Sequence, residues 1–251
     1  MMEGRSEYWF VADVHLAQPA TDELERELRF ATFLKRIPVE KVRALYLLGD
    51  IWDFWYEYRD VISRPGGRVL AALQRLMDEG VEVWFCTGNH DVWTYSYFES
   101  LGMHRFYQPY HVQLAGKDFC LGHGDMLGGA TWDYRLMMWA YNNRVLQWLF
   151  SSLHPWIAYR LARKWSLFSR KRHSAHHFRG EVEPLWKFAV EDSTQHHIDY
   201  FVFGHYHEAV DITLPTGAKF YIVKDWISGG MHYAVFNGSS FELRSLETPA
   251  E

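Results

Sequence analysis

Seven residues that could bind metal ions follow short apolar segments of the sequence. They are two aspartates, one asparagine and four histidines, namely Asp13, His15, Asp50, Asn89, His123, His205 and His207. A carboxylate directly after a buried strand is costly unless it is paired or bound to a metal ion. Carboxylate, amide and imidazole ligands together suit first-row divalent ions such as Mn²⁺, Fe²⁺ or Zn²⁺. We therefore expect the seven side chains to form one metal centre.

The number of potential ligands indicates two ions rather than one. Seven ligands are too many for a tetrahedral ion, but they suit two ions that share a carboxylate. Two ions about 3.5–4 Å apart can bind a hydroxide and clamp a phosphoryl group for in-line attack. Taken singly, an Asp-x-His is common by chance, and a Gly-His-x-His is more often packing or an exposed loop. Five such segments in this order, each after an apolar strand, favour the metal centre.

Alternating strands and helices are expected to position the first four of these residues. Apolar runs predict strands at residues 8–12, 45–48 and 81–86. Helical patterns lie between them at residues 21–36 and 67–79. This alternation favours an α/β arrangement with parallel strands.

The pattern of the second half of the chain predicts short strands before and after a helical insertion. A hairpin is expected at residues 110–121, and a further helix at residues 182–197. The remaining strands are expected at residues 200–203, 209–214, 219–223, 232–236 and 241–243. The predicted fold class is thus α/β (a four-layer α+β arrangement): two packed sheets, helices outside. We expect residues 1–251 to form a single domain that carries an insertion at residues 130–180.

Composition favours a cytoplasmic protein without a general affinity for nucleic acid. The chain has 26 basic and 31 acidic residues, which gives a net charge of −5. Cys86 and Cys120 each lie in an apolar run and read as buried, reduced thiols. The N-terminus lacks the apolar core of a signal peptide, and no window resembles a membrane-spanning helix.

The insertion combines large apolar side chains with basic ones. A two-helix hairpin has limited room to bury so many aromatic residues, so part of them must pack on the main domain. The aromatic side chains that do not pack there would form an apolar slot or a membrane-facing surface. No acidic residue lies between residues 160 and 180. The basic residues could simply form a solvated face of a helix. Their position beside large apolar side chains, however, suits a ligand with phosphates and fatty chains, or an anionic bilayer.

The five ligand segments resemble the signature of the calcineurin-like metallophosphoesterases. They are Asp13-Val14-His15, Gly49-Asp50, Gly88-Asn89-His90-Asp91, Gly122-His123 and Gly204-His205-Tyr206-His207. The resemblance implies a β-sandwich flanked by helices and two divalent metal ions, with Mn²⁺ expected. It implies that one ion is held by Asp13, His15, Asp50 and His207. It implies that the other is held by Asp50, Asn89, His123 and His205, so that Asp50 bridges.

The same resemblance implies catalytic roles for two residues that are not ligands. His90 would face the phosphate as a general acid or charge stabiliser, and Asp91 would orient it. Either a histidine or an arginine at this position, if cationic, could stabilise phosphoryl charge.

Three further segments are similar to the UDP-2,3-diacylglucosamine hydrolases of lipid A biosynthesis. They are residues 11–16, 49–55 and 224–226. The resemblance implies cleavage of a pyrophosphate to UMP and 2,3-diacylglucosamine 1-phosphate, at the cytosolic face of the inner membrane. The best-known members carry Arg where this chain has His90. The implied substrate contacts are Asn89, His90, Arg163, Lys164, Ser169, Arg170, Lys171, Arg172 and His205.

Two alternatives stay open at this point. The same metal centre could serve a nucleotide pyrophosphatase, a phosphodiesterase or a nuclease, although the apolar insertion argues against nucleic acid as a partner. A catalytically dead scaffold or lipid-binding module is the second alternative, because the retromer scaffold subunit resembles this fold. The complete ligand set argues against a scaffold.

Overall fold

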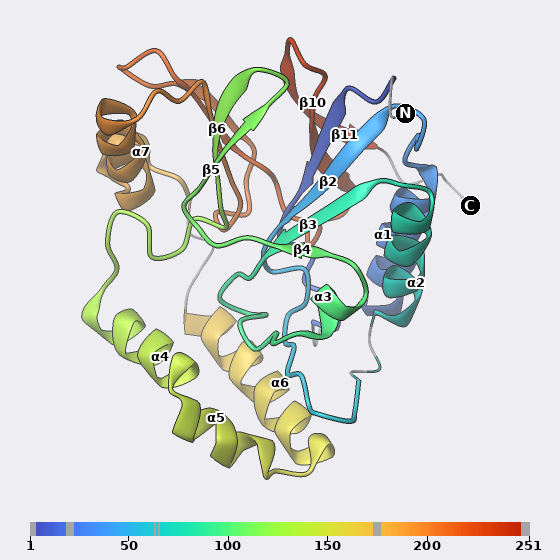
Figure 1. Cartoon of the computed structure of the whole chain (residues 1–251). Helices are drawn as coiled ribbons and strands as arrows, with labels where there is room; N and C mark the ends of the chain where they lie inside the picture. Colours follow the sequence, from blue (N-terminus) through green and yellow to red (C-terminus); the bar gives the residue numbers. More distant parts are fainter. Residues whose placement is uncertain (1–3, 19–22, 63, 65, 173–176, 247–251) are drawn as a thin grey trace.

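Two β-sheets packed face to face form the body of the molecule in the computed structural model (Figure 1). The structure describes residues 4–18, 23–62, 64, 66–172 and 177–246, and the side chains of residues 165–172 are not described. The six-stranded sheet has the order β11 (Phe241–Leu246), β10 (Met231–Phe236), β1 (Glu7–Val11), β2 (Val42–Leu48), β3 (Glu82–Cys86), β4 (His104–Arg105). The five-stranded sheet has the order β5 (Tyr110–Leu114), β6 (Lys117–Leu121), β7 (Tyr200–Phe203), β9 (Lys219–Ile222), β8 (Val210–Thr213).

Parallel pairing brings the carboxyl ends of the key strands to one edge. β1, β2, β3 and β4 pair in parallel in the first sheet, and β6, β7 and β9 do so in the second. Loops that leave these strands therefore gather at the same end of the sandwich. The metal-ligand candidates lie in these loops.

The space between the sheets is filled by aromatic side chains. Phe10 of β1 stacks on Tyr46 of β2 at 5.2 Å and on Phe119 of β6 at 6.2 Å between ring centroids. The alternate residues of β1, Trp9 and Val11, point to the opposite face and are also buried. β1 is therefore apolar on both faces, which explains its continuous apolar run.

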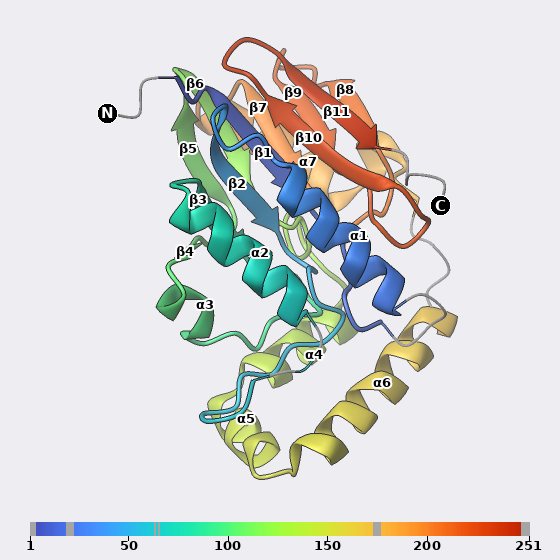
Figure 2. The same ribbon diagram turned by 90° about the vertical axis from the view of Figure 1, so that its right-hand side faces the viewer.

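Helices cover the outer faces of both sheets. α1 (Glu23–Arg36) and α2 (Gly67–Asp78) lie on the six-stranded sheet, as Figure 2 shows. α7 (Pro184–Gln195) packs on the five-stranded sheet through Leu185 and Ala189. Cys86 and Cys120 are buried free thiols, as expected. The predicted fold class, two sheets with helices outside, is confirmed.

Three helices, rather than the expected two, lie between β6 and the short helix η1 (Gly180–Val182). They are α4 (Trp132–Asn142), α5 (Arg144–Ser151) and α6 (Pro155–Arg172), called here the α4–α6 segment. Asn143 separates α4 from α5, because its extended backbone ends one helix while its side chain accepts the N–H groups of Val145 and Leu146. Of the helices described, none has the length and apolar character needed to cross a membrane. The short helix α3 (Tyr97–Ser100) lies before β4.

Candidate metal centre

Backbone hydrogen bonds join the loops that carry the candidate ligands. The N–H of Asp13 donates to Gly49 O at 3.1 Å, and the N–H of His15 donates to Asp50 O at 2.9 Å. The N–H of Trp226 donates to Asp13 O at 3.1 Å. These bonds fix the loops after β1, β2 and β9 against one another.

Five of the seven candidate ligands have a left-handed backbone. The φ angles are 52° at Asp13, 51° at His15, 52° at Asp50, 73° at His205 and 58° at His207. Such conformations cost on the order of 1–3 kcal/mol each for residues with a side chain, and they cluster at functional sites. The fold thus holds strained backbone at the residues singled out for metal binding.

Two of the motif glycines permit close packing of the loops. A Cβ on Gly204 would lie 2.6 Å from Asp13 Oδ2, and a Cβ on Gly88 would overlap the Asp50 carboxylate. The backbone therefore approaches both carboxylates more closely than any other residue would allow.

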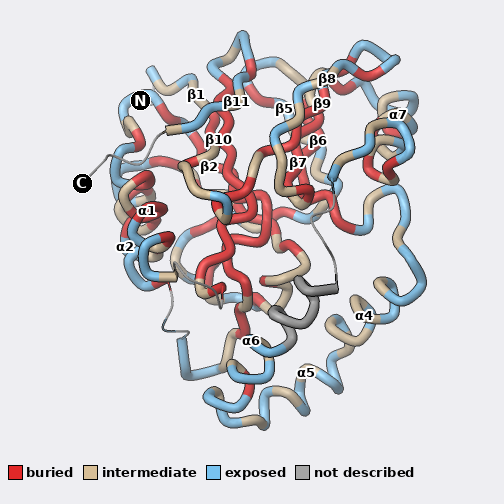
Figure 3. The backbone as a smooth tube through the Cα atoms, turned by 180° about the vertical axis from the view of Figure 1, so that it is seen from behind, coloured by how far each residue is buried: buried red, intermediate tan, exposed pale blue. Residues whose placement is uncertain are grey.

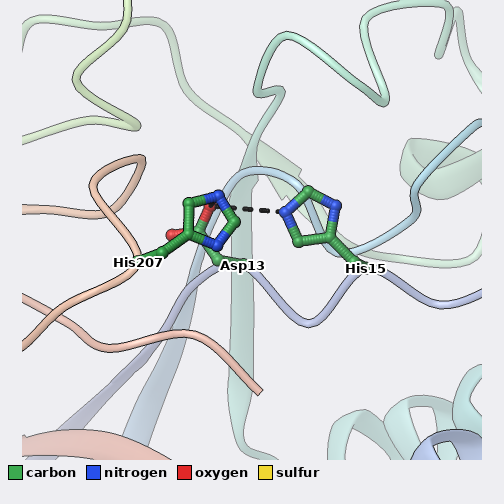
Figure 4. Close-up of side chains that lie close together, drawn as sticks. All are labelled: Asp13, His15 and His207. Atoms are coloured by element: carbon green, nitrogen blue, oxygen red, sulfur yellow. Dashed lines mark ion pairs between the residues drawn. The ribbon is translucent and has the colours of Figure 1, made fainter. Parts of the chain in front are cut away.

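The first ligand group joins Asp13, His15 and His207 (Figure 4). Asp13 Oδ1 lies 3.7 Å from His15 Nε2 and 3.9 Å from His207 Nε2. The two imidazole rings are nearly parallel, with centroids 5.1 Å apart. Three donor atoms from two distant loops thus converge.

The second ligand group surrounds His123 Nε2. This atom lies 3.4 Å from Asp50 Oδ2, 3.3 Å from Asn89 Oδ1 and 3.3 Å from His205 Nδ1. Asp50 and His123 are fully buried, whereas Asn89 and His205 are partly exposed. The structure therefore brings all seven predicted ligands together.

Asp50 lies between the two groups. Its Oδ2 atom is 3.7 Å from His15 Nε2 in the first group and 3.4 Å from His123 Nε2 in the second. Its other oxygen, Oδ1, accepts the N–H of His90 at 2.8 Å. A carboxylate in this position can be shared by two ions.

Two histidines are oriented from behind by hydrogen-bond acceptors: His15 Nδ1 lies 3.2 Å from Asp53 Oδ1, and His123 Nδ1 lies 2.9 Å from Leu48 O. His207 Nδ1 faces the Asp225 carboxylate at 3.7 Å, an ion-pair distance. An acceptor at Nδ1 fixes the tautomer that presents the Nε2 lone pair to a metal ion. No role for either carboxylate could be predicted from the sequence, although Asp53 lies in the segment 49–55 and Asp225 in the segment 224–226.

The residues present fit a pair of divalent cations. Asp13 Oδ1 is fully buried and accepts no hydrogen bond from the residues that the structure describes. Its surroundings are histidine nitrogens at 3.7 Å and 3.9 Å, too distant for hydrogen bonds. A buried carboxylate oxygen in this state suits a cation.

Charges within the cluster shift the pKa values of its members strongly. Burial opposes the charged form of His123, but the carboxylates of Asp50, Asp13 and Asp125 together outweigh burial and raise the pKa of His123 well above its usual range. Burial of Asp50 favours its neutral form, but the charges of His123, His90 and other neighbours outweigh burial. They hold the pKa of Asp50 well below its usual range. Burial, followed by the charge of His123, lowers the pKa of His205 to about 4.

The described acceptor beside the His90 ring is Asp53 rather than the expected Asp91. His90 Nδ1 lies 3.0 Å from Asp53 O and 3.6 Å from Asp53 Oδ1. Asp91 instead accepts backbone N–H groups, including those of Ile51 at 2.9 Å and Gly88 at 2.8 Å. Burial and the nearby Asp50 raise the pKa of Asp91 to about 6. Asp91 therefore holds the loops together, and Asp53 orients His90.

The predicted substrate contacts on α6 are only partly described. Arg163 forms an ion pair with Glu23 of α1 at 2.7 Å, and Lys164 is exposed. The side chains of the other four predicted contacts lie outside the described residues: Ser169, Arg170, Lys171 and Arg172. The described contacts of Arg163 and Lys164 do not join them to the ligand cluster.

The α4–α6 segment rests on the loops that leave the cluster. Trp93 Nε1 donates to Tyr141 O at 2.7 Å, and the Tyr56 hydroxyl donates to Gln147 O at 2.8 Å. The Phe150 ring packs against Trp93 at 4.8 Å and Tyr56 at 4.9 Å. Part of the aromatic content thus packs on the main body, as expected.

Four tryptophans of the segment face solvent. Trp132, Trp139, Trp148 and Trp156 are 60–77% exposed. α4 and α5 bury no residue at all (Figure 3). By contrast, Trp52 and Trp55 are buried and structural. The surplus of apolar surface predicted for the insertion is present.

Comparison with known proteins gives one family and a set of named relatives. The profile of the calcineurin-like phosphoesterase family matches residues 7–209. A UDP-2,3-diacylglucosamine hydrolase of Porphyromonas gingivalis is 36% identical over 260 residues, covering 97% of this chain and 98% of the relative. A protein of the same name from Yersinia pseudotuberculosis is 28% identical over 232 residues, covering 88% of this chain and 92% of the relative.

A solved structure shares the fold. A dimetal phosphatase of Danio rerio superposes with a TM-score of 0.50 at 14% identity, covering 98% of each chain. At this identity the likeness concerns the arrangement of sheets and helices.

Proposed function

The chain belongs to the calcineurin-like phosphoesterase family, and from this premise we propose that it hydrolyses UDP-2,3-diacylglucosamine. The reaction cleaves the pyrophosphate and releases UMP and 2,3-diacylglucosamine 1-phosphate, as in lipid A biosynthesis. One observation carries the proposal: the likeness to a hydrolase of that name covers 97% of this chain, so it includes both the ligand cluster and the α4–α6 segment.

Two divalent metal ions, Mn²⁺ in this proposal, belong in the ligand cluster. Asp13, His15 and His207 would hold one ion, Asn89, His123 and His205 the other, and Asp50 both. When bound, such ions supply a hydroxide for attack on phosphorus and neutralise phosphoryl charge.

His90 is the proposed acid or charge stabiliser beside the ions. Its Nδ1 faces a carbonyl oxygen, Asp53 O, so this nitrogen carries the proton and donates. The ring is thereby held with Nε2 directed away from Asp53. A protonated ring would donate from Nε2 to a phosphoryl oxygen as charge develops there.

The α4–α6 segment, within the insertion at residues 130–180, is the proposed lid of a single domain. Its exposed tryptophans and aliphatic side chains supply an apolar surface for acyl chains. The basic residues of α6 supply charge for the phosphates or for anionic lipid headgroups: Arg163, Lys164, Arg170, Lys171 and Arg172, with Ser169 between them. The protein would therefore act peripherally at the cytosolic face of the inner membrane, with no nucleic-acid partner.

Incubation of the purified protein with Mn²⁺ and UDP-2,3-diacylglucosamine tests the proposal. We expect release of UMP, measured by chromatography, and much slower release from UDP-N-acetylglucosamine, which lacks the fatty chains. Hydrolysis of bis(p-nitrophenyl) phosphate without release of UMP from the lipid would point to a general phosphodiesterase. Failure to bind Mn²⁺ would point to a scaffold.

A further inference from the structure

A second group of metal-binding side chains lies on the outer face of the five-stranded sheet. His111 Nε2 is 2.8 Å from Asp192 Oδ2, and His196 Nδ1 is 3.0 Å from Asp192 Oδ1. The two imidazole rings have centroids 4.6 Å apart. The donor atoms of all three residues lie within 4.8 Å of one another. None of these residues belongs to the ligand cluster of the proposed phosphoesterase site.

Two elements of the fold create this group. His111 lies on β5, an edge strand, directly opposite Cys120 of β6 in the antiparallel ladder. Directly opposite residues share a face of the sheet. Cys120 packs against α7, which carries Asp192 in its last turn, and His196 caps the same helix. A β-strand and a helix end, 81 residues apart in sequence, thus converge.

The chemistry of the group matches a transition-metal site with an open position. Two imidazoles and one carboxylate are the protein ligands of many zinc sites in which water completes the coordination. The Asp192 carboxylate is only 8% exposed, whereas the His111 and His196 side chains are 35% and 51% exposed. The carboxylate is therefore anchored, and the histidine side is open to an incoming ion.

The interior side of the group is closed. Cys120 lies opposite His111 in the ladder and is completely buried. The ligands that an ion could reach from solvent are therefore the two imidazoles and the carboxylate. The ligands offered are those of a borderline divalent ion rather than a soft thiolate site.

We propose that His111, Asp192 and His196 bind a Zn²⁺-type ion that fastens α7 to the edge strand β5. The plain alternative is a hydrogen-bonded clamp, in which each ring donates one N–H to one carboxylate oxygen. The two differ in what the nitrogen atoms hold, a metal ion or a proton. The inference is independent of the proposed hydrolase activity, because the sites share no residue.

Counting bound Zn²⁺ distinguishes the two. Full-length protein is freed of metal with a chelator, dialysed against Zn²⁺ and analysed by mass spectrometry of the metal. The double variant His111→Gln/His196→Gln should bind one equivalent less than the unchanged protein, with Mn²⁺-dependent hydrolysis the same within about twofold. His104→Gln removes an exposed histidine outside both groups and should lose no equivalent.

Three results would decide against the site. These are equal Zn²⁺ content in the double variant and the unchanged protein, loss of an equivalent in His104→Gln, or no Zn²⁺-dependent slowing of amide exchange in α7. If the double variant fails the circular dichroism check for folding, Asp192→Asn keeps the side-chain shape and gives the same comparison. Retained Zn²⁺ in that variant would equally overturn the site.

Discussion

The ligand cluster and the α4–α6 segment lie next to each other but are held in opposite ways. Asp13, His15 and His123 are completely buried, and the loops that carry them are bonded to one another through their backbones. Within the described side chains of residues 132–164, Ala158 alone is buried. The body thus fixes the candidate ligands at strand ends, whereas the segment presents an exposed apolar surface. In the proposed function the cluster governs turnover and the segment governs use of a lipid substrate, so mutations should separate the two.

The largest effect is expected at Asp50, the residue between the two ligand groups. Asp50→Ala should remove a ligand from both ions. We expect kcat to fall by on the order of 10³-fold or more, which exceeds the typical cost of losing one hydrogen-bond donor to the transition state. Activity and metal content should be measured together. Asp13→Ala is the matched comparison, because this aspartate serves one group. A clearly greater loss in Asp13→Ala would refute the shared role of Asp50.

The next effect is expected at His90, which lies beside the cluster without being a predicted ligand. His90→Ala should lower kcat by about 10²-fold, the range typical of a positioned acid or charge stabiliser. Metal content should stay near that of the unchanged protein. A loss of bound metal in this variant would make His90 a ligand and change the assignment of the site.

A smaller effect is expected at Asp53, which contacts both His15 and His90. Asp53→Asn keeps the shape but removes the charge behind His15, and such outer residues change metal affinity or activity by about 10–100-fold. Asp225→Asn is the matched control, because Asp225 lies farther from its histidine, at 3.7 Å rather than 3.2 Å. We expect the smaller loss there, in metal titrations as well as in kcat. The reverse order would mean that Asp53 does not position the site.

These residues also show how far the sequence predicts the molecule. The seven candidate ligands could be predicted because each follows an apolar strand, and parallel strand ends meet at one edge. Asp53 could not be assigned, because its role depends on the direction of the His15 and His90 rings. His111 and Asp192 carried no local signal, since β5 and α7 meet only in the folded chain. The break at Asn143 depends on one side-chain cap and was missed for that reason.

The smallest effect on stability is expected for a substitution on α5. The same substitution should affect the lipid substrate selectively. Trp148 is 67% exposed, so Trp148→Ala should change the free energy of unfolding by no more than about 0.5 kcal/mol. If this side chain meets acyl chains, KM for the lipid substrate should rise several-fold, with hydrolysis of bis(p-nitrophenyl) phosphate unchanged. Phe150, two residues on, packs on Trp93 and Tyr56. Phe150→Ala should therefore loosen α5, seen as faster amide exchange, and weaken use of both substrates, since it disturbs the loops after Asp53 and His90. Equal effects of the two variants on both substrates would contradict the proposed division between a buried catalytic centre and an exposed surface for acyl chains.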